Sequence, residues 1–332
     1  MKLSKVLSPL LTTLALLLPI AETNAAKPAD FDRKLQQFAQ EMSNKHGFAL
    51  TELNKLLADV TYKQSIIDAI SRPAEGKAWH EYRPIFVTDK RARAGVKFWQ
   101  ENQELLKQAE KKYGVPPEII TAIIGVETLY GSYTGKYQVL DALSTLAFAY
   151  PKRSKFFRKQ LEEFLLLIKE EKLPPKKMLG SYAGAMGMPQ FIPSSYRAYA
   201  VDFDKDGKRD LLGNKADVIG SVAAYFSRHG WQQGEPITQK AWGITADHND
   251  FVKAGMKPSL TIQQLQQAGI KMSQPPAPDS LTSLIRLRGK QGNEYWLGLN
   301  NFYVITRYNH SNLYAMAVYQ LSREILKQKE HS

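Results

Sequence analysis

The sequence predicts a mainly α-helical protein with one small part that contains β-strands. Over most of the chain, apolar residues recur at intervals of three and four, which is the spacing of one face of an α-helix. Residues 119–126 are apolar almost all round, as is typical of a helix buried in a core. Between about 235 and 300 the composition shifts to Gln, Pro and Gly with short β-like runs. That shift predicts a small mixed or β-containing insertion in an otherwise helical fold.

The first 26 residues have the pattern of a secretory leader. Lys2 and Lys5 precede an apolar run over 6–20, and small residues follow at 23–26. A run of about 15 residues is short for a bilayer span of roughly 20, so an uncleaved anchor is the weaker alternative. We expect a cleaved signal peptide and a periplasmic mature protein, soluble or at most peripherally attached to the membrane. Export argues against nucleic acid as a partner and favours cell-envelope polymers.

Helical spacing and helix-end signals locate most of the remaining elements. They predict helices within 30–70 with a break at Gly47, at 89–113, from 117, at 142–150, at 154–171 and at 311–328, and strands at 283–288 and 294–299. The Pro-punctuated stretch 72–88 is expected to be extended. Asp89 is expected to cap the long helix that follows, and Gly114 to end it. Pro116 and Pro117 suit the first turn of the next helix.

Composition excludes several classes of protein. The 332 residues include no cysteine, which rules out a disulfide scaffold, a thiolate zinc site and a cysteine nucleophile. Lys and Arg number 45 against 32 Asp and Glu, a net charge of +13 that favours an anionic partner. The six histidines are scattered without zinc-peptidase spacing, and neither a G-x-S-x-G elbow nor a phosphate-binding P-loop occurs.

Glu127 is the strongest candidate for a catalytic group. It follows the apolar segment 119–126, where desolvation and the negative end of the helix dipole both favour a protonated carboxyl group. A carboxylic acid kept protonated near neutral pH is what a general acid acting on a glycosidic oxygen needs. The position alone leaves open a glutamate that turns outward at the helix end and has no catalytic role.

An acidic loop beginning at residue 202 resembles the first half of an EF-hand. Asp202, Asp204 and Asp206 occupy its first, third and fifth positions, and a glycine follows at the sixth. The seventh position, which contributes a backbone carbonyl in such loops, is Lys208. The standard last position carries no carboxylate, so Asp217 would have to close a longer loop. The pattern predicts a cation site, and an acidic turn without a ligand is the alternative.

Residues 181–191 combine small residues with polar ones. The small residues let backbone approach a ligand or another helix closely. Ser181 and Gln190 offer a hydroxyl and an amide that suit sugar hydroxyl or acetamido groups. Aromatic residues that suit sugar rings, or are ordinary core, concentrate later in the chain: Tyr225, Tyr295, Trp296, Phe302, Tyr303 and Tyr308. Taken alone, tight helix packing is the better explanation for the small residues.

Four motifs in order resemble the membrane-bound lytic murein transglycosylase B family, over about residues 30–325. They are Gly-Val-Glu-Thr at 125–128, the stretch at 180–196, the acidic loop, and Asn-Phe-Tyr-Val-Ile-Thr-Arg-Tyr-Asn at 301–309. The resemblance implies a mainly α fold with a lysozyme-like helical core, an EF-hand-like calcium loop, an additional helical domain and a small β-containing domain. The lipid-attachment cysteine of membrane-bound members is absent here, which leaves membrane anchoring in question.

The resemblance also implies a chemistry and a partner. Glu127 would be the sole catalytic acid and base, cleaving the β-1,4 bond between N-acetylmuramic acid and N-acetylglucosamine in peptidoglycan glycan strands. The product would carry a 1,6-anhydromuramoyl end, and no cofactor would take part in the chemistry. Calcium would be structural, held by Asp202, Asp204, Asp206, Lys208 and Asp217. Substrate-binding residues would be Arg153, Ser181, Met188, Gln190, Phe191, Tyr225, Tyr303, Tyr308 and Asn309.

Two other functions compete with this interpretation. A lysozyme-like hydrolase would use the same Glu127 with water as acceptor and needs a second carboxylate, such as Asp141. A non-catalytic peptidoglycan-binding protein would have no use for a buried Glu127.

The predicted domain organisation follows the resemblance. It places a signal peptide at 1–26, a helical N-terminal part at 27–115 with helix 311–328 packed on it, a catalytic core at 116–234 with its acidic loop at 202–217, a β-containing insertion at 235–300, and a site segment and helix at 301–332.

Overall fold

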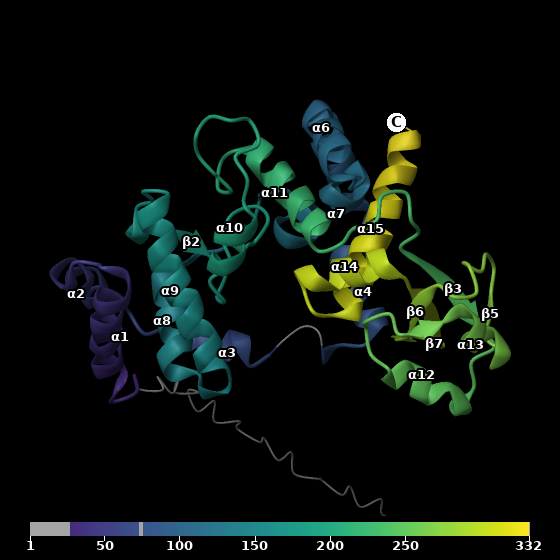
Figure 1. Ribbon diagram of the computed structural model, residues 1–332, viewed down its shortest axis with the longest axis horizontal. Coiled ribbons are helices and arrows are strands. Elements are labelled where there is room, and N and C mark those ends of the chain that lie inside the picture. Colours follow the sequence, from purple (N-terminus) through teal and green to yellow (C-terminus); the bar gives the residue numbers. More distant parts are fainter. Residues whose placement is uncertain (1–26, 73–75, 332) are drawn as a thin grey trace, which may run out of the picture.

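Helices dominate the protein, as the sequence predicts. The computed structural model describes residues 27–72 and 76–331, so the predicted leader lies outside the described residues. The first two helices, α1 and α2, and the larger of two sheets, which contains β3, β5, β6 and β7, lie at opposite ends of the long axis (Figure 1). Most of the other helices lie between these ends. None of the helices in the described ranges is both long and apolar enough to cross a membrane.

The N-terminal helices follow the predicted spacing. They are α1 (Phe31–His46), α2 (Leu50–Ala58) and α3 (Gln64–Ile70). Helix α1 buries Phe31, Leu35, Phe38 and Met42 on one face, and Gly47 ends it with the left-handed φ of 64° that glycine adopts readily. Helices α1 and α3 pack on α8 (Val139–Ala149), which packs in turn along α9 (Ser154–Glu170).

Two predictions in the next segment are wrong. The stretch 72–88 contains a helix, α4 (Trp79–Phe86), because Trp79 and Tyr82 are both 1% exposed and this burial outweighs the missing N–H of Pro84. The predicted long helix is divided into α5 (Asp89–Glu101) and α6 (Gln103–Tyr113). The break falls at the buried Asn102, whose side-chain amide donates to the Phe98 carbonyl at 2.7 Å.

The cap of α5 also differs from the prediction. Thr88, not Asp89, is the N-cap, since its hydroxyl accepts the Arg91 N–H at 3.2 Å. Gly114 ends α6 as expected, with φ of 73°.

The centre of the molecule is built on α7 (Pro117–Thr128) and α15 (Asn312–Glu330). Helix α15 packs against α4, α5 and α7, and α14 (Asn300–Tyr308) packs against α15. Helices α10 (Pro193–Tyr199) and α11 (Lys215–Arg228) complete this region, α11 contacting α6 and α7. These contacts cross the boundary expected at residue 115, and the division into domains stays a prediction.

The strands form two small antiparallel sheets. The first pairs β1 (Tyr137–Gln138) with β2 (Leu179–Gly180). The second has the order β4-β6-β7-β3-β5. Its strands are β3 (Thr238–Trp242), β4 (Leu260–Thr261), β5 (Lys271–Met272), β6 (Leu281–Gly289) and β7 (Gly292–Gly298). Helices α12 (Asn249–Lys253) and α13 (Ile262–Gln267) lie beside this sheet. Both predicted strands are therefore present, as β6 and β7.

The larger sheet buries both of its faces. Leu284 pairs with Leu297 in a small separate core that includes α13 residues, whereas Ile285 pairs with Trp296 in the main core. Successive residues of a strand point to opposite faces, so the hairpin β6–β7 connects the two cores.

Candidate active site

Glu127 stands at the end of α7, a helix whose apolar residues are all buried. The helix ends here because Leu129 and Tyr130 adopt left-handed φ values of 49° and 58°. The chain then folds back, and a Cβ added at Gly125 would lie only 2.4 Å from the Tyr130 hydroxyl oxygen. Glu127 itself stays partly exposed. This sharp turn places its carboxylate at the edge of the core.

The Glu127 carboxylate has a buried phenol as partner. The Tyr314 hydroxyl donates to Glu127 Oε1 at 2.5 Å, and Tyr314 on α15 is 2% exposed. Burial, together with the negative charge of Glu127, raises the pKa of Tyr314 well above its ordinary value, so the hydroxyl remains a donor. The two residues are 187 positions apart, and no local sequence signal points to this pairing.

Arg91 occupies the negative end of the α7 dipole. Its guanidinium donates to the carbonyls of Gly125 at 2.8 Å and Val126 at 3.4 Å. Burial lowers the pKa of Arg91, yet an arginine remains charged in this setting. A cation at a helix C-terminus offsets the dipole, so the dipole acts on Glu127 less than the sequence alone suggests. No local sequence pattern points to Arg91 as part of this site.

The stretch after β2 is held in place by its own polar side chains and by the hydroxyl of Thr128 at the end of α7. Ser181 Oγ accepts the Ala185 N–H at 3.1 Å, and Gln190 Nε2 donates to Gly187 and Thr134 carbonyls at 2.9 and 3.0 Å. The Thr128 hydroxyl, next to Glu127, donates to the Met188 carbonyl at 2.9 Å. The small residues are needed for this packing.

Glycines in the stretch leave no room for a side chain. A Cβ at Gly180 would lie 2.3 Å from the Ala185 carbonyl oxygen, and one at Gly187 would lie 2.2 Å from that of Leu211. Tight packing therefore accounts for these glycines.

An aromatic cluster lies beside this stretch. Ring centroids of Phe191, Tyr225 and Tyr308 are 4.9–5.8 Å apart. The Tyr308 hydroxyl donates to the Pro189 carbonyl at 2.6 Å, and its ring stacks on Tyr314 at 6.4 Å. Ring contacts thus link three predicted residues, Phe191, Tyr225 and Tyr308, to Tyr314. Met188 is bound through its carbonyl to Thr128, the neighbour of Glu127 in sequence. Asn309 follows Tyr308 directly, at the end of α14.

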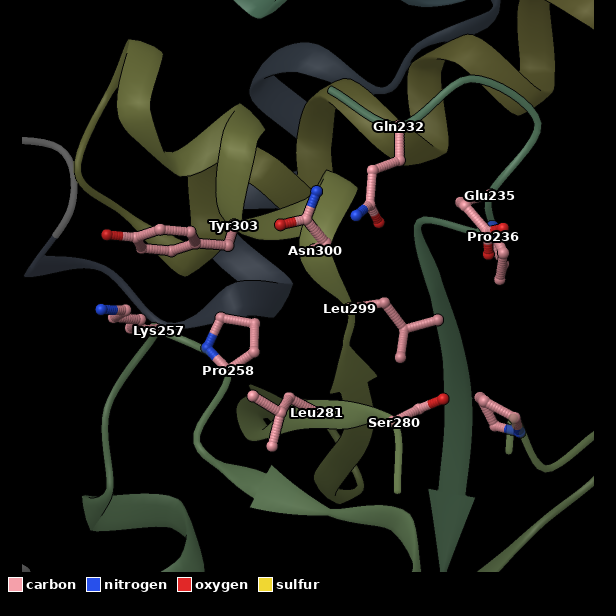
Figure 2. A pocket seen from close by; sticks show the side chains of 11 residues that line it. Gln232, Glu235, Pro236, Lys257, Pro258, Ser280, Leu281, Leu299, Asn300 and Tyr303 are labelled. Atoms are coloured by element: carbon pink, nitrogen blue, oxygen red, sulfur yellow. The ribbon is translucent and has the colours of Figure 1, made fainter. Parts of the chain in front are cut away.

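Two predicted residues lie in other surroundings. Arg153 packs its guanidinium 4.3 Å from the ring centroid of Phe156, at the start of α9. Tyr303 lines a separate pocket of about 450 Å³, between α14, the loop before β3 and the start of β6 (Figure 2).

Asp141, the candidate second carboxylate, is buried in α8. It accepts the Thr61 N–H at 2.8 Å, which ties α8 to the segment before α3. Burial raises the pKa of Asp141. These contacts give it a structural role.

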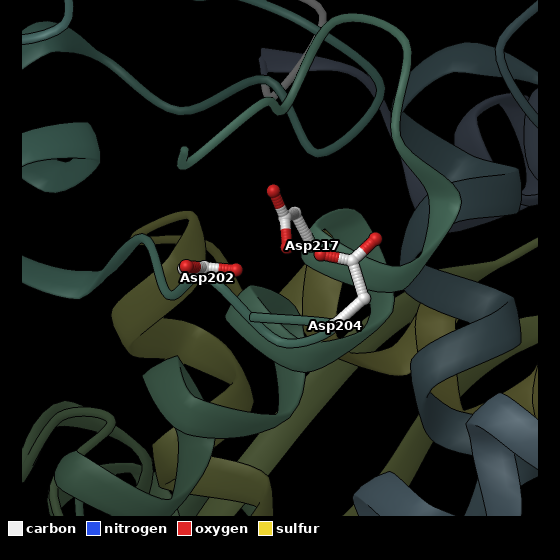
Figure 3. Close-up of side chains that lie close together, drawn as sticks. All are labelled: Asp202, Asp204 and Asp217. Carbon is white, nitrogen blue, oxygen red and sulfur yellow. The ribbon is translucent and has the colours of Figure 1, made fainter. Parts of the chain in front are cut away.

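Three carboxylates of the acidic loop converge. One oxygen each of Asp202, Asp204 and Asp217 lies within 4.8 Å of the others (Figure 3). Asp217, in the first turn of α11, is fully buried and accepts the N–H groups of Phe203 and Asp210, both at 2.7 Å. Burial, and then the charges of Asp204 and Asp202, raise its pKa. A buried carboxylate facing two others fits a hard divalent cation.

The other two expected cation ligands are not in this group of three. The carboxylate of Asp206 accepts the Lys208 N–H at 2.9 Å, within the loop. As ligands, Asp206 and Lys208 stay a prediction.

Comparison with known proteins gives consistent matches over nearly the whole chain. A family model described as the transglycosylase SLT domain matches residues 30–323. The chain is 44% identical over 300 residues to membrane-bound lytic murein transglycosylase B of Escherichia coli, covering 87% of this chain and 82% of that protein.

Solved structures give the same picture. Soluble lytic transglycosylase SltB1 of Pseudomonas aeruginosa matches with a TM-score of 0.84 and 52% identity, over 90% of this chain and 99% of that one. Escherichia coli Slt35 in complex with calcium matches with a TM-score of 0.81 and 43% identity, over 89% of this chain and 93% of that one. Pseudomonas aeruginosa SltB3 in complex with NAG-anhNAM-pentapeptide matches with a TM-score of 0.77 and 30% identity, over 88% of this chain and 78% of that one.

Proposed function

The chain belongs to the transglycosylase SLT-domain family, and on this premise we propose that it is a lytic transglycosylase of peptidoglycan. It cleaves the β-1,4 bond between N-acetylmuramic acid and N-acetylglucosamine and leaves a 1,6-anhydromuramoyl end. One observation carries the assignment to this site: Glu127, at the end of the buried helix α7, has its carboxylate bound at 2.5 Å by the buried Tyr314. The SltB3 complex with an anhydro-muropeptide supports the product.

In the proposed mechanism, Glu127 carries both proton transfers. Its protonated carboxyl group gives a proton to the glycosidic oxygen as the bond from that oxygen to C1 of the muramoyl sugar breaks. The carboxylate then takes the proton of the C6 hydroxyl of the same sugar. The C6 oxygen forms the new bond to C1, and Glu127 is protonated again for the next cycle. No water is consumed.

An intramolecular nucleophile makes one carboxylate sufficient. The C6 hydroxyl already belongs to the reacting sugar, so no second residue has to position and activate a water molecule. A two-carboxylate hydrolase needs such a residue, and Asp141 instead binds the Thr61 N–H. Tyr314 orients the Glu127 carboxylate and supplies a donor when that group is ionised.

The residues around Glu127 form the proposed sugar-binding surface. Aromatic faces suit the apolar faces of sugar rings, and hydroxyl and amide groups suit their substituents. We place the following residues in contact with the glycan: Ser181, Met188, Gln190, Phe191, Tyr225, Tyr308 and Asn309. Arg153 and Tyr303 are proposed to contact more distant parts of the substrate.

We also propose that the acidic loop holds a structural calcium ion. Asp202, Asp204 and Asp217 offer converging oxygen ligands, and the similar Slt35 has been solved in complex with calcium. Calcium offsets the mutual repulsion of the three carboxylates and takes no part in the proton transfers. The proposed substrate, peptidoglycan, and the leader pattern at 1–26 together support a periplasmic location. The net positive charge is compatible with peripheral contact with the membrane.

The product ends test the proposed function. Purified protein is incubated with peptidoglycan, and the released muropeptides are identified by mass spectrometry. We expect products one water lighter than those of a lysozyme, without reducing muramoyl ends. Reducing ends would make the protein a hydrolase, and binding without any cleavage would make it a binding protein.

A pair of matched variants tests the role of Glu127. Glu127→Gln removes the transferable proton. Because both proton transfers fall on this residue, activity should fall by about ten-thousandfold or more. Glu118→Gln makes the same chemical change in the first turn of the same helix and should leave activity near the wild-type value. Equal activity of the two variants would exclude Glu127 from the mechanism.

A further inference from the structure

The turn that follows α7 has a strained backbone. Leu129 and Tyr130, directly after the helix, both have left-handed φ values, 49° and 58°. Leucine and tyrosine rarely adopt this conformation, which costs them free energy, and a helix that ends on a left-handed residue usually has glycine there. Such backbone persists only where surrounding contacts hold it. The turn begins two residues after Glu127, so the contacts that hold it also fix the end of the helix that carries this carboxylate.

The side chain of Tyr130 is fixed between two helices. Its hydroxyl donates to the Arg91 carbonyl on α5 at 3.0 Å. The same hydroxyl fits closely against two glycines, because a Cβ added at Gly95 of α5 or Gly125 of α7 would lie 2.5 or 2.4 Å from its oxygen. The Tyr130 ring centroid lies 5.5 Å from that of Phe98. Burial raises the pKa of Tyr130, so its hydroxyl keeps the proton that it donates.

Arg91 also binds the helix on the other side of the turn. Its guanidinium donates to the carbonyls of Gly125 at 2.8 Å and Val126 at 3.4 Å, the two residues before Glu127. The carbonyls of the last helical turn have no partner further along the helix, so donors of this kind stabilise a helix end. One residue of α5 thus holds both sides of the turn. Its backbone carbonyl binds Tyr130, and its side chain binds the last turn of α7.

We propose that Arg91 and Tyr130 are positioning residues that hold the strained turn and thereby fix the direction of the Glu127 carboxylate, an inference that rests on the proposed function. Glu127 has to give a proton to the glycosidic oxygen and then take one from the C6 hydroxyl, so its carboxylate must be in reach of two atoms of one sugar. A displacement of about 1 Å at a reacting group can lower a rate about a hundredfold. In this role Arg91 and Tyr130 act through Glu127 and not on the sugar, so their loss changes kcat and leaves KM nearly unchanged.

The test compares Arg91→Gln with Arg93→Gln, which makes the same chemical change at an exposed position of the same helix. Initial rates of anhydro-muropeptide release from peptidoglycan are measured well below the melting temperature of each variant. Arg91→Gln should lower kcat about 10- to 100-fold with KM within about twofold of wild type. Arg93→Gln should leave both constants within about twofold. Tyr130→Phe removes one neutral hydrogen bond and should lower kcat about two- to tenfold.

A second substitution separates positioning from a general loss of stability. Leu129→Gly supplies a residue that adopts left-handed φ without strain, so the turn depends less on Arg91. The loss of kcat caused by Arg91→Gln should therefore be at least about threefold smaller in the Leu129→Gly protein than in the wild type. If Arg91→Gln does not fold, the same cycle is measured with Tyr130→Phe.

The outcomes are distinct. Equal losses of kcat with and without Leu129→Gly, or a folded Arg91→Gln protein with kcat within twofold of wild type, would overturn the positioning role. An increase in KM with kcat unchanged would overturn it as well, because the residues would then act on sugar binding. Failure of the proposed function differs from all of these, since wild-type protein would then form no anhydro product.

Discussion

Removing the hydroxyl of Tyr314 probes the contact on which the proposed mechanism depends. Tyr314→Phe keeps the ring and its stacking on Tyr308 but deletes the 2.5 Å hydrogen bond to Glu127. A hydrogen bond to a charged group contributes about 1.5–3 kcal/mol. Since about 1.4 kcal/mol corresponds to a tenfold rate change, kcat should fall roughly 10- to 150-fold. KM should change little, because the hydroxyl acts on Glu127 and not on the sugar.

The assay is the initial rate of muropeptide release from peptidoglycan, with the melting temperature as a check on folding. Tyr308→Phe is the matched control, because it removes a neighbouring buried hydroxyl that donates to the Pro189 carbonyl. That change should affect KM more than kcat, since Tyr308 belongs to the proposed sugar-binding surface.

A double-mutant cycle makes the reasoning refutable. If Tyr314 acts through Glu127, the double variant Tyr314→Phe/Glu127→Gln should be no slower than Glu127→Gln alone. Losses that multiply would show that Tyr314 acts independently of Glu127. A folded Tyr314→Phe protein with kcat within twofold of wild type would refute the positioning role altogether.

Three further predictions concern stability. Chelation of calcium-loaded protein should lower its melting temperature, because the ion stabilises the folded state by about 2.7 kcal/mol at a hundredfold excess over Kd. Asp217→Asn should abolish this effect. Identical melting curves with and without chelator would contradict the calcium site. Gly125→Ala should destabilise by about 1–3 kcal/mol in urea unfolding, since its Cβ would lie 2.4 Å from the Tyr130 hydroxyl oxygen. Burial would raise the pKa of Glu162, but hydrogen bonds from two lysines and a histidine hold it at about 2. The ionised Glu162 therefore stabilises the fold above its ordinary pKa of 4.5, and this stabilisation is lost as pH falls toward 2. Glu162→Gln should lower the free energy of unfolding by about 1–2 kcal/mol at pH 7 and by less at pH 3. A difference in urea unfolding that is the same at both pH values would contradict this.

Elements with strong local signals were predictable from the sequence. Helix α1 follows its apolar spacing and ends at Gly47, and α7 follows its prolines and its apolar run. Strands β6 and β7 lie where the β-like runs predict them. These elements follow from contacts between residues close in sequence, or from a periodicity that one buried face imposes.

Elements decided by distant contacts were not predictable. Helix α4 forms in a stretch that its prolines mark as extended, because Trp79 and Tyr82 become buried where α4 packs on α15 and β6. The break at Asn102 is likewise a tertiary effect, since the buried side chain binds the Phe98 carbonyl instead of continuing the helix. Burial against a remote segment can outweigh local propensity.

The sequence by itself singled out the residues that we propose carry the chemistry and hold the ion: Glu127 at the end of an apolar helix, and an acidic loop beginning at Asp202. Only the tertiary structure decided what surrounds them. It brings Tyr314 to the carboxylate, places Arg91 on the helix end and buries Asp217 beside two other carboxylates. A side chain's identity and local spacing are written in the chain, but its hydrogen-bond partners and its desolvation arise from segments that meet only when the core forms.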